Sequence, residues 1–144
     1  MIRLILLLLL LGVIGPSSIR GGTPEEALRI RSSYEKALEE WAGKLAIAAP
    51  EEQLNVWANR PASSYHGELM WNAIKGDLDQ EWAIEYCVWL LERAPVFSVG
   101  REEGSAVSRA ARIVEVLLTL HYRSAKVGML FLSLTRKSDP AIMK

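Results

Sequence analysis

Cysteine and histidine are scarce in this sequence. Its 144 residues include one cysteine, Cys87, and two histidines, His66 and His121. A single cysteine cannot form a disulfide within the chain, so the fold has to be stabilised by packing. The zinc-protease spacing H-E-x-x-H is absent, and His66-Gly67-Glu68 matches only half of the zinc deaminase motif because no P-C-x-x-C follows it. We therefore expect no catalytic residues and neither a metal nor another cofactor.

Net charge and glycine-rich motifs are lacking as well. The 17 Lys and Arg residues balance the 17 Asp and Glu residues, so no strongly basic stripe is available to neutralise phosphates and nucleic acid is not an expected partner. The acidic cluster from Asp77 to Glu85 lacks the glycine and the distal glutamate of a calcium loop. We interpret it as helix capping and solvated charge, and we expect that the protein is not an enzyme.

The N-terminus contains a long apolar run. Arg3 provides a positive charge, an apolar segment of about eleven residues follows it, and small residues with a helix-breaking Pro16 come next, which is the pattern of a signal peptide. A membrane-spanning helix needs roughly 20 apolar residues. The sequence therefore predicts a signal peptide over residues 1–22 and an exported protein, periplasmic or secreted. The alternative is a protein anchored in the membrane by an uncleaved signal.

Residues 23–137 are predicted to form one helical domain. Half of the residues in the sequence are hydrophobic, and after the leader they recur at spacings of three and four without a convincing strand pattern. The expected fold is all-α, an irregular bundle or array of about five to six helices. We expect Thr23 to cap the first helix and Ser105 to cap the fifth. The expected helices cover about 24–49, 51–58, 63–76, 80–94, 105–123 and 125–135, and a long loop covers 96–104.

The fourth predicted helix, about 80–94, is apolar around most of its circumference, and such a helix is normally surrounded by others. We expect it to lie at the centre of the fold with Cys87 as an inert buried thiol. The chain also contains five tryptophans. Most of them lie on helix faces that need burial, so we expect core packing, with a ligand-binding aromatic surface as the alternative.

Charge is divided unevenly along the chain. Residues 23–93 carry 13 acidic and 7 basic side chains, whereas residues 94–144 carry 4 acidic and 8 basic ones. One interpretation is a basic surface that docks a protein partner, and the other is attraction between the two halves of one fold. The candidate interaction residues are Arg101, Arg109, Arg112, Arg123 and Lys126.

The C-terminal segment, residues 138–144, begins with Ser138-Asp139-Pro140, which is typical of a helix start. Four residues are too few for a stable helix. We interpret this segment as the start of a truncated or frayed further helix.

The stretch from Trp71 to Ala83, continued by residues 90–95, resembles the helical region upstream of the thioredoxin-like domain in exported bacterial redoxin-type proteins. The resemblance implies an accessory helical domain that precedes a redox module. No Cys-x-x-Cys is present, so no redox residues are carried over. The predicted function is a non-catalytic interaction or accessory domain with a protein partner, in which case the membrane is contacted only through an uncleaved leader. The alternative is a small envelope protein that binds an apolar or saccharide ligand in an aromatic-lined helical pocket.

Overall fold

The computed structural model describes residues 22–137, with side chains to residue 132. All named elements in this range are helices, which confirms the predicted all-α class, and an isolated β-bridge joins Arg101 and Ser108. The predicted signal peptide, apart from Gly22, and the segment 138–144 lie outside the described residues. The elements are α1 (Pro24–Ile47), α2 (Gln53–Ala58), α3 (Ser63–Ile74), the 3-10 helix η1 (Glu81–Ala83), α4 (Ile84–Arg93), α5 (Pro95–Ser98), α6 (Arg109–Thr119) and α7 (Ala125–Lys137).

Helix α1 begins as predicted. The Thr23 hydroxyl accepts a hydrogen bond from the Glu26 amide at 3.1 Å, and Pro24 occupies the first turn, where its missing N–H costs nothing. Just before it, the Gly22 amide donates to the Ala73 carbonyl at 2.9 Å. The start of α1 is therefore fixed to the end of α3.

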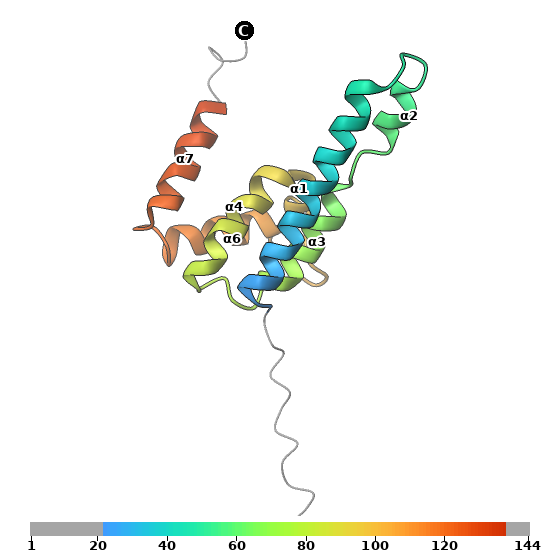
Figure 1. Ribbon diagram of the computed structural model, residues 1–144. Coiled ribbons are helices and arrows are strands. Elements are labelled where there is room, and N and C mark those ends of the chain that lie inside the picture. The colour runs from blue at the N-terminus through green and yellow to red at the C-terminus, as the bar shows by residue number, and fades with distance from the viewer. Residues whose placement is uncertain (1–21, 138–144) are drawn as a thin grey trace, which may run out of the picture.

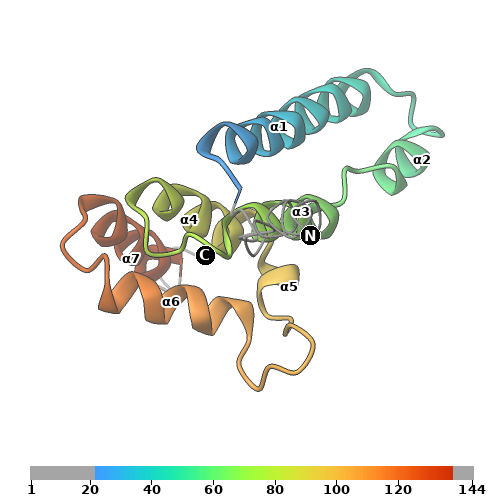
Figure 2. The same cartoon turned by 90° about the horizontal axis from the view of Figure 1, so that it is seen from below.

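The second half of α1 projects from the rest of the molecule together with α2. In both views α2 lies beside the far end of α1 and away from the other helices (Figures 1 and 2). The predicted apolar stripe of α1 is buried only near its beginning, at Ala27, Ile30 and Tyr34. We call residues 39–60 the arm.

Helix α4 is the centre of the fold, as its apolar circumference predicts. It contacts η1, α3, α5, α6 and α7, and it buries Ile84, Tyr86, Cys87, Trp89 and Leu90. We call α3, α4 and the helices packed on them the hub. The buried apolar residues of the core are Ala27, Ile30, Tyr34, Met70, Trp71, Ala73, Ile74, Leu78, Ile84, Tyr86, Cys87, Trp89, Leu90, Ala94, Ile113, Leu117, Val127 and Leu130.

Several predicted boundaries are wrong. Ser105 does not cap α6. Ser108 does so by accepting a hydrogen bond from the Ala111 amide at 3.2 Å, so the helix begins at Arg109, three residues later than a cap at Ser105 would place it. The Ser105 hydroxyl instead donates to the Val107 carbonyl inside the loop. Pro95 does not simply end α4, since it also starts α5, which occupies part of the predicted 96–104 loop.

The end of α6 and the role of the acidic cluster also differ from the prediction. Val107, just before α6, is 50% exposed, whereas Ile113 within the helix is fully buried. His121 lies beyond the end of α6 at Thr119 rather than on the helix. Asp77 and Asp79 do not cap the fourth helix, because Gln80 precedes η1 in extended conformation without a side-chain cap.

Candidate interaction surfaces

The five candidate basic residues do not form one surface. Arg109 is half-buried, and its guanidinium lies 4.3 Å from the centre of the Phe97 ring, which makes it part of the packing between α5 and α6. Arg101 is exposed in the loop before α6. The other three residues each lie near a different group of acidic side chains, described next.

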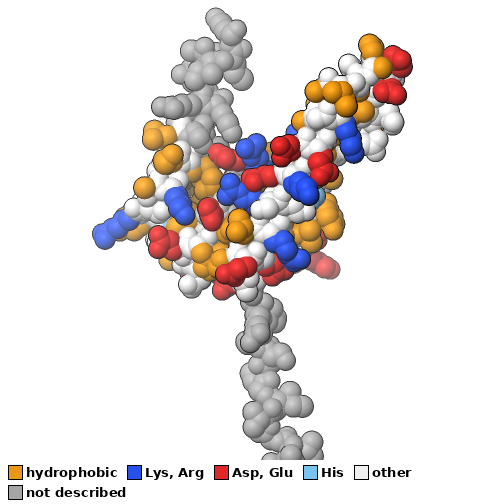
Figure 3. All heavy atoms as spheres, in the orientation of Figure 1, with side chains coloured by type: hydrophobic (Ala, Val, Ile, Leu, Met, Phe, Trp, Pro, Cys, Tyr) orange, Lys and Arg blue, Asp and Glu red, His pale blue; other side chains and the backbone are white. Residues whose placement is uncertain are grey.

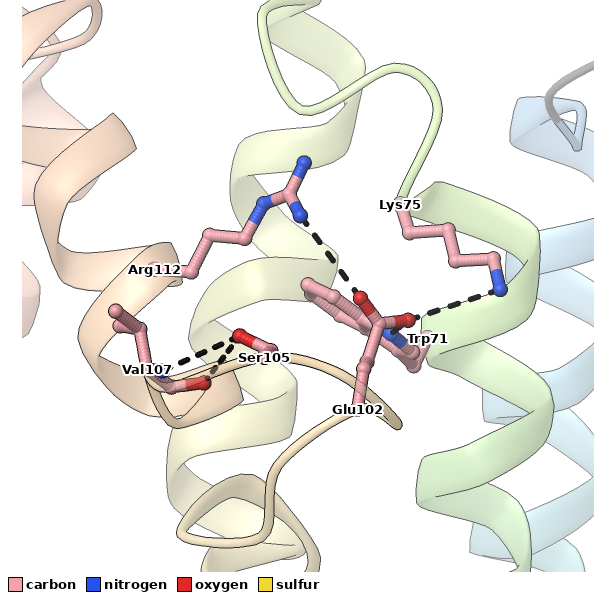
Figure 4. A network of polar contacts seen from close by, with 6 residues as sticks. All are labelled: Trp71, Lys75, Glu102, Ser105, Val107 and Arg112. Atoms are coloured by element: carbon pink, nitrogen blue, oxygen red, sulfur yellow. Dashed lines mark hydrogen bonds and ion pairs between the residues drawn. The ribbon is translucent and has the colours of Figure 1, made fainter.

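Arg112 belongs to a polar network around Glu102, in which Figure 4 shows the carboxylate placed between two cations. Trp71 donates its indole N–H to Glu102 Oε1 at 2.7 Å, Lys75 Nζ lies 3.7 Å from the same oxygen, and Arg112 Nη1 lies 3.8 Å from Oε2. The Trp71 hydrogen bond, helped by the charges of Lys75 and Arg112, lowers the pKa of Glu102 below its ordinary value. This network holds the loop 99–108 against α3 and α6.

Arg123 and Lys126 line two separate hollows that also contain acidic residues. Arg123 shares one with Asp79 and Glu81, and Lys126 shares the other with Glu85. In these two hollows, basic residues of the C-terminal half therefore line the same surface as acidic residues of the N-terminal half. This arrangement favours attraction within the fold over a continuous basic docking surface.

The residues that could carry chemistry lie apart and have structural contacts. His121 Nε2 is 2.9 Å from the Leu78 carbonyl, which places it at the boundary of the core, and the His66 ring lies against Tyr34. Cys87 is 1% exposed, and burial raises its pKa to about 12, so its thiol is a poor nucleophile at neutral pH. Among the described residues, no three His, Cys, Asp or Glu side chains gather as a metal-ligand set.

The described tryptophans contact other rings or the core. Trp71 is 2% exposed, and Trp89, which is 5% exposed, meets Tyr34 edge to face at 5.5 Å. In the arm, Trp41 stacks on Trp57 with ring centres 4.9 Å apart. These rings serve packing within the protein, and the predicted aromatic-lined ligand pocket stays a prediction.

An open groove of about 440 Å³ lies between α1, α4 and α7. Figure 3 shows a hollow between α7 and the second half of α1. Trp89 lines the groove, and its buried indole N–H has no hydrogen-bond acceptor among the described residues. The apolar lining residues are Val88, Trp89, Met129 and Leu130, and the charged ones are Arg31, Glu35, Glu85, Glu92, Arg93 and Lys126.

The outer side of α7 adds apolar surface beside this groove. Met129 is 71% exposed and Leu132 is 61% exposed, while Val127 and Leu130 on the inner side are 2% exposed each. The sequence analysis gave Met129 no role. The available signal was that Lys126 is the single charged residue between 125 and 135, so α7 is apolar on more than one face.

The tip of the arm is a second exposed apolar surface. Ile47, which ends α1, is 87% exposed, and Leu54 and Trp57 of α2 are 79% and 52% exposed. The sequence analysis placed Leu54 and Trp57 on a helix but did not predict that the arm would leave the core. We refer to these three residues as the arm tip.

Comparisons with known proteins identified no relative of this chain. No family model, no curated protein and no solved structure matches the chain. The resemblance to redoxin-type proteins stays a prediction. A search of the described residues for a helix with the length and hydrophobicity needed to cross a membrane found none.

Proposed function

We propose that this chain is an exported, non-catalytic interaction domain that binds a protein in the groove between α1, α4 and α7. The observation that carries the proposal is the apolar surface of Met129, which is 71% exposed at the edge of a groove of about 440 Å³. Burying such surface contributes roughly 25 cal/mol per Å². A partner segment that covers Met129 therefore gains binding energy.

The lining of the groove suits an amphipathic segment. Val88 and Met129 offer apolar contacts, while charged side chains such as Arg93 and Lys126 lie along the same groove. Grooves of this type accept an amphipathic helix, whose apolar face enters while its polar face remains wet. Methionine adapts its shape to a partner more readily than branched residues do.

The arrangement of the reactive side chains supports a non-catalytic role. His121 contacts the Leu78 carbonyl, His66 lies against Tyr34, and the Cys87 thiol is buried with a raised pKa. A nucleophile needs a base within hydrogen-bond reach. The contacts of these three residues are instead structural.

The proposal is tested by photo-crosslinking in the cell that produces the protein. A benzophenone amino acid replaces Met129 in the full chain, and a matched variant carries it at Val96, which is 76% exposed on α5 away from the groove. We expect a discrete protein adduct from position 129 and none from position 96. Equal adduct patterns at both positions, or none at position 129, would refute the proposal.

A further inference from the structure

We propose that the surface between α1 and α3 binds a phosphate group, supplied either as free phosphate or as the monoester of a small molecule. The site is an open hollow of about 220 Å³ that shares no lining residue with the groove between α1, α4 and α7. The inference is therefore independent of the protein partner proposed for the groove. The lining residues of this hollow are Arg29, Ile30, Ser33, Tyr65, His66 and Leu69.

Two packed helices bring these residues together. Arg29 and Ser33 are four residues apart on α1, so their side chains lie on one face of that helix. Tyr65 and Leu69 have the same spacing on α3, which packs on α1. Ile30 is only 8% exposed and holds this part of α1 in the core. Polar side chains on two packed helices are held more precisely than side chains on loops.

Arg29 provides a positive charge that is not used within the described structure. Among the described residues that line the hollow, none is acidic, and Glu26 lines a neighbouring hollow with Arg29. The ion pairs between described side chains do not include Arg29, whereas Arg31 pairs with Glu35 at 2.9 Å. A guanidinium group binds phosphate oxygens through parallel hydrogen bonds. Arg29 can therefore offer its N–H groups to a ligand.

His66 is held in place with one nitrogen left for a ligand. The centre of its ring lies 4.9 Å from that of Tyr34 and 5.3 Å from that of Tyr65. Its Nδ1 lies 3.2 Å from the Ala62 carbonyl oxygen, which can only accept, so Nδ1 carries a proton and donates it. In the neutral imidazole Nε2 is then an acceptor, and it has no hydrogen-bond partner among the described residues.

This set of groups matches phosphate better than carboxylate or sulfate. Near neutral pH inorganic phosphate carries at least one proton, and a phosphomonoester carries one part of the time because its second pKa is about 6. The P–OH group can donate to His66 Nε2, while the other oxygens accept from Arg29 and from the hydroxyls of Ser33 and Tyr65. Carboxylates and sulfate are deprotonated at this pH and have no proton to donate to Nε2.

The size of the hollow favours a small ligand. Its volume of about 220 Å³ is below the roughly 300–1,000 Å³ of pockets that hold drug-sized molecules. Tyr65 is 62% exposed and Leu69 is 38% exposed, so the site is open on one side. A phosphate group can therefore occupy the hollow while its organic substituent, if it has one, remains in solvent.

The first test is calorimetric titration of the full chain at neutral pH in a buffer free of phosphate. The probes are sodium phosphate, phenyl phosphate and sodium sulfate at matched ionic strength. We expect saturable binding of phosphate or phenyl phosphate, and binding of sulfate that is weaker by at least about tenfold because it lacks the hydrogen bond to Nε2. The tighter of the two phosphate probes identifies free phosphate or a monoester as the ligand.

The second test uses variants of the two central residues. Arg29 is exposed, so Arg29→Gln should fold, and we expect it to weaken phosphate binding by at least about tenfold. His66→Phe keeps a ring against Tyr34 but removes Nε2, so its affinity for phosphate should fall to its affinity for sulfate. Arg101→Gln removes the same charge from an exposed loop position and is the matched control, with wild-type affinity expected.

Three results would overturn the phosphate site. They are the lack of saturable binding with both phosphate and phenyl phosphate, equal affinities of the wild type for phosphate and sulfate, and wild-type affinity in Arg29→Gln. Equal losses in Arg29→Gln and Arg101→Gln would also overturn it, because they would show a response to net charge rather than to the site. None of these results affects the photo-adduct expected from position 129.

Discussion

The hub and the arm use the same residue types for different purposes. In the hub, Trp89 is 5% exposed and meets Tyr34 edge to face, and its helix is covered by five other elements. In the arm, Trp57 is 52% exposed and stacks on Trp41. The hub is therefore stabilised by helices that pack on α4 from several sides. The arm depends on the contact between α1 and α2, including the stacked rings of Trp41 and Trp57. This difference predicts that substitutions in the two regions have unequal effects.

The largest contrast concerns leucine truncation. Leu90 in α4 is fully buried, so Leu90→Ala should lower the free energy of unfolding by about 2–5 kcal/mol through lost transfer energy and a cavity. Leu54→Ala at the arm tip should change it by less than about 0.5 kcal/mol. Urea-induced unfolding measures both values. Similar losses at the two positions would mean that the arm tip is packed in the protein.

Replacing two helical glycines by alanine should change the free energy of unfolding in opposite directions. A Cβ at Gly67 in α3 would lie 2.9 Å from the Ala94 Cβ and 3.0 Å from the Phe97 ring, so Gly67→Ala should cost about 1–3 kcal/mol. A Cβ at Gly43 in the arm meets nothing within 4 Å, so Gly43→Ala should stabilise its helix by about 0.5–1 kcal/mol. Thermal unfolding of the two variants tests this, and destabilisation by both would contradict an open arm.

Loss of the ring pair should loosen the arm without loosening the hub. Trp41→Leu removes the stack on Trp57 and the hydrogen bond to Val56, each worth about 1 kcal/mol. We expect amide hydrogen exchange in α2 to accelerate by about tenfold or more while exchange in α4 is unchanged. Faster exchange in both helices would show that arm and hub open together.

The smallest effect concerns the loop that Glu102 holds against the hub. Glu102→Gln keeps an acceptor for the Trp71 indole but removes the charge that Lys75 and Arg112 face, so we expect a loss of about 0.5–1 kcal/mol at pH 7. Because folding lowers the pKa of Glu102, its contribution is present at neutral pH and is lost as the pH falls through that lowered value.

The measurement is the difference in Tm between the wild type and Glu102→Gln across pH. It should be constant near neutrality, should begin to shrink near about pH 4, where free carboxyl groups become protonated, and should disappear only below the lowered pKa of Glu102. A difference that persists in acid would mean that the effect comes from hydrogen-bond geometry rather than charge.

The sequence predicted those features that depend on local chemistry. The cap at Thr23 follows from a hydroxyl placed three residues before Glu26, and the central position of α4 follows from its apolar circumference. The cap of α6 was missed because Ser105 and Ser108 are both suitable residues, and the bridge between Arg101 and Ser108 selects the second.

The exposed surfaces were less predictable, because an apolar stripe on one helix does not show along how much of its length a neighbouring helix covers it. Trp41 continues the apolar stripe of α1, yet α3 covers only the beginning of that helix, so the later residues belong to the arm. The sequence shows where the basic residues are, but their acidic neighbours come from distant segments. The ion pairs of Glu102 with Lys75 and Arg112 form only in the folded structure, so residue spacing in the sequence does not reveal them.

The burial of Cys87 makes α4 its own reporter. The chain contains no second cysteine, and the Cys87 side chain is 1% exposed within the central helix. A thiol reagent can label it only when this part of the hub opens, so the labelling rate of Cys87 reports how readily the hub opens. The folding of the hub can thus be timed in the unmodified protein, without an added dye or a substituted residue.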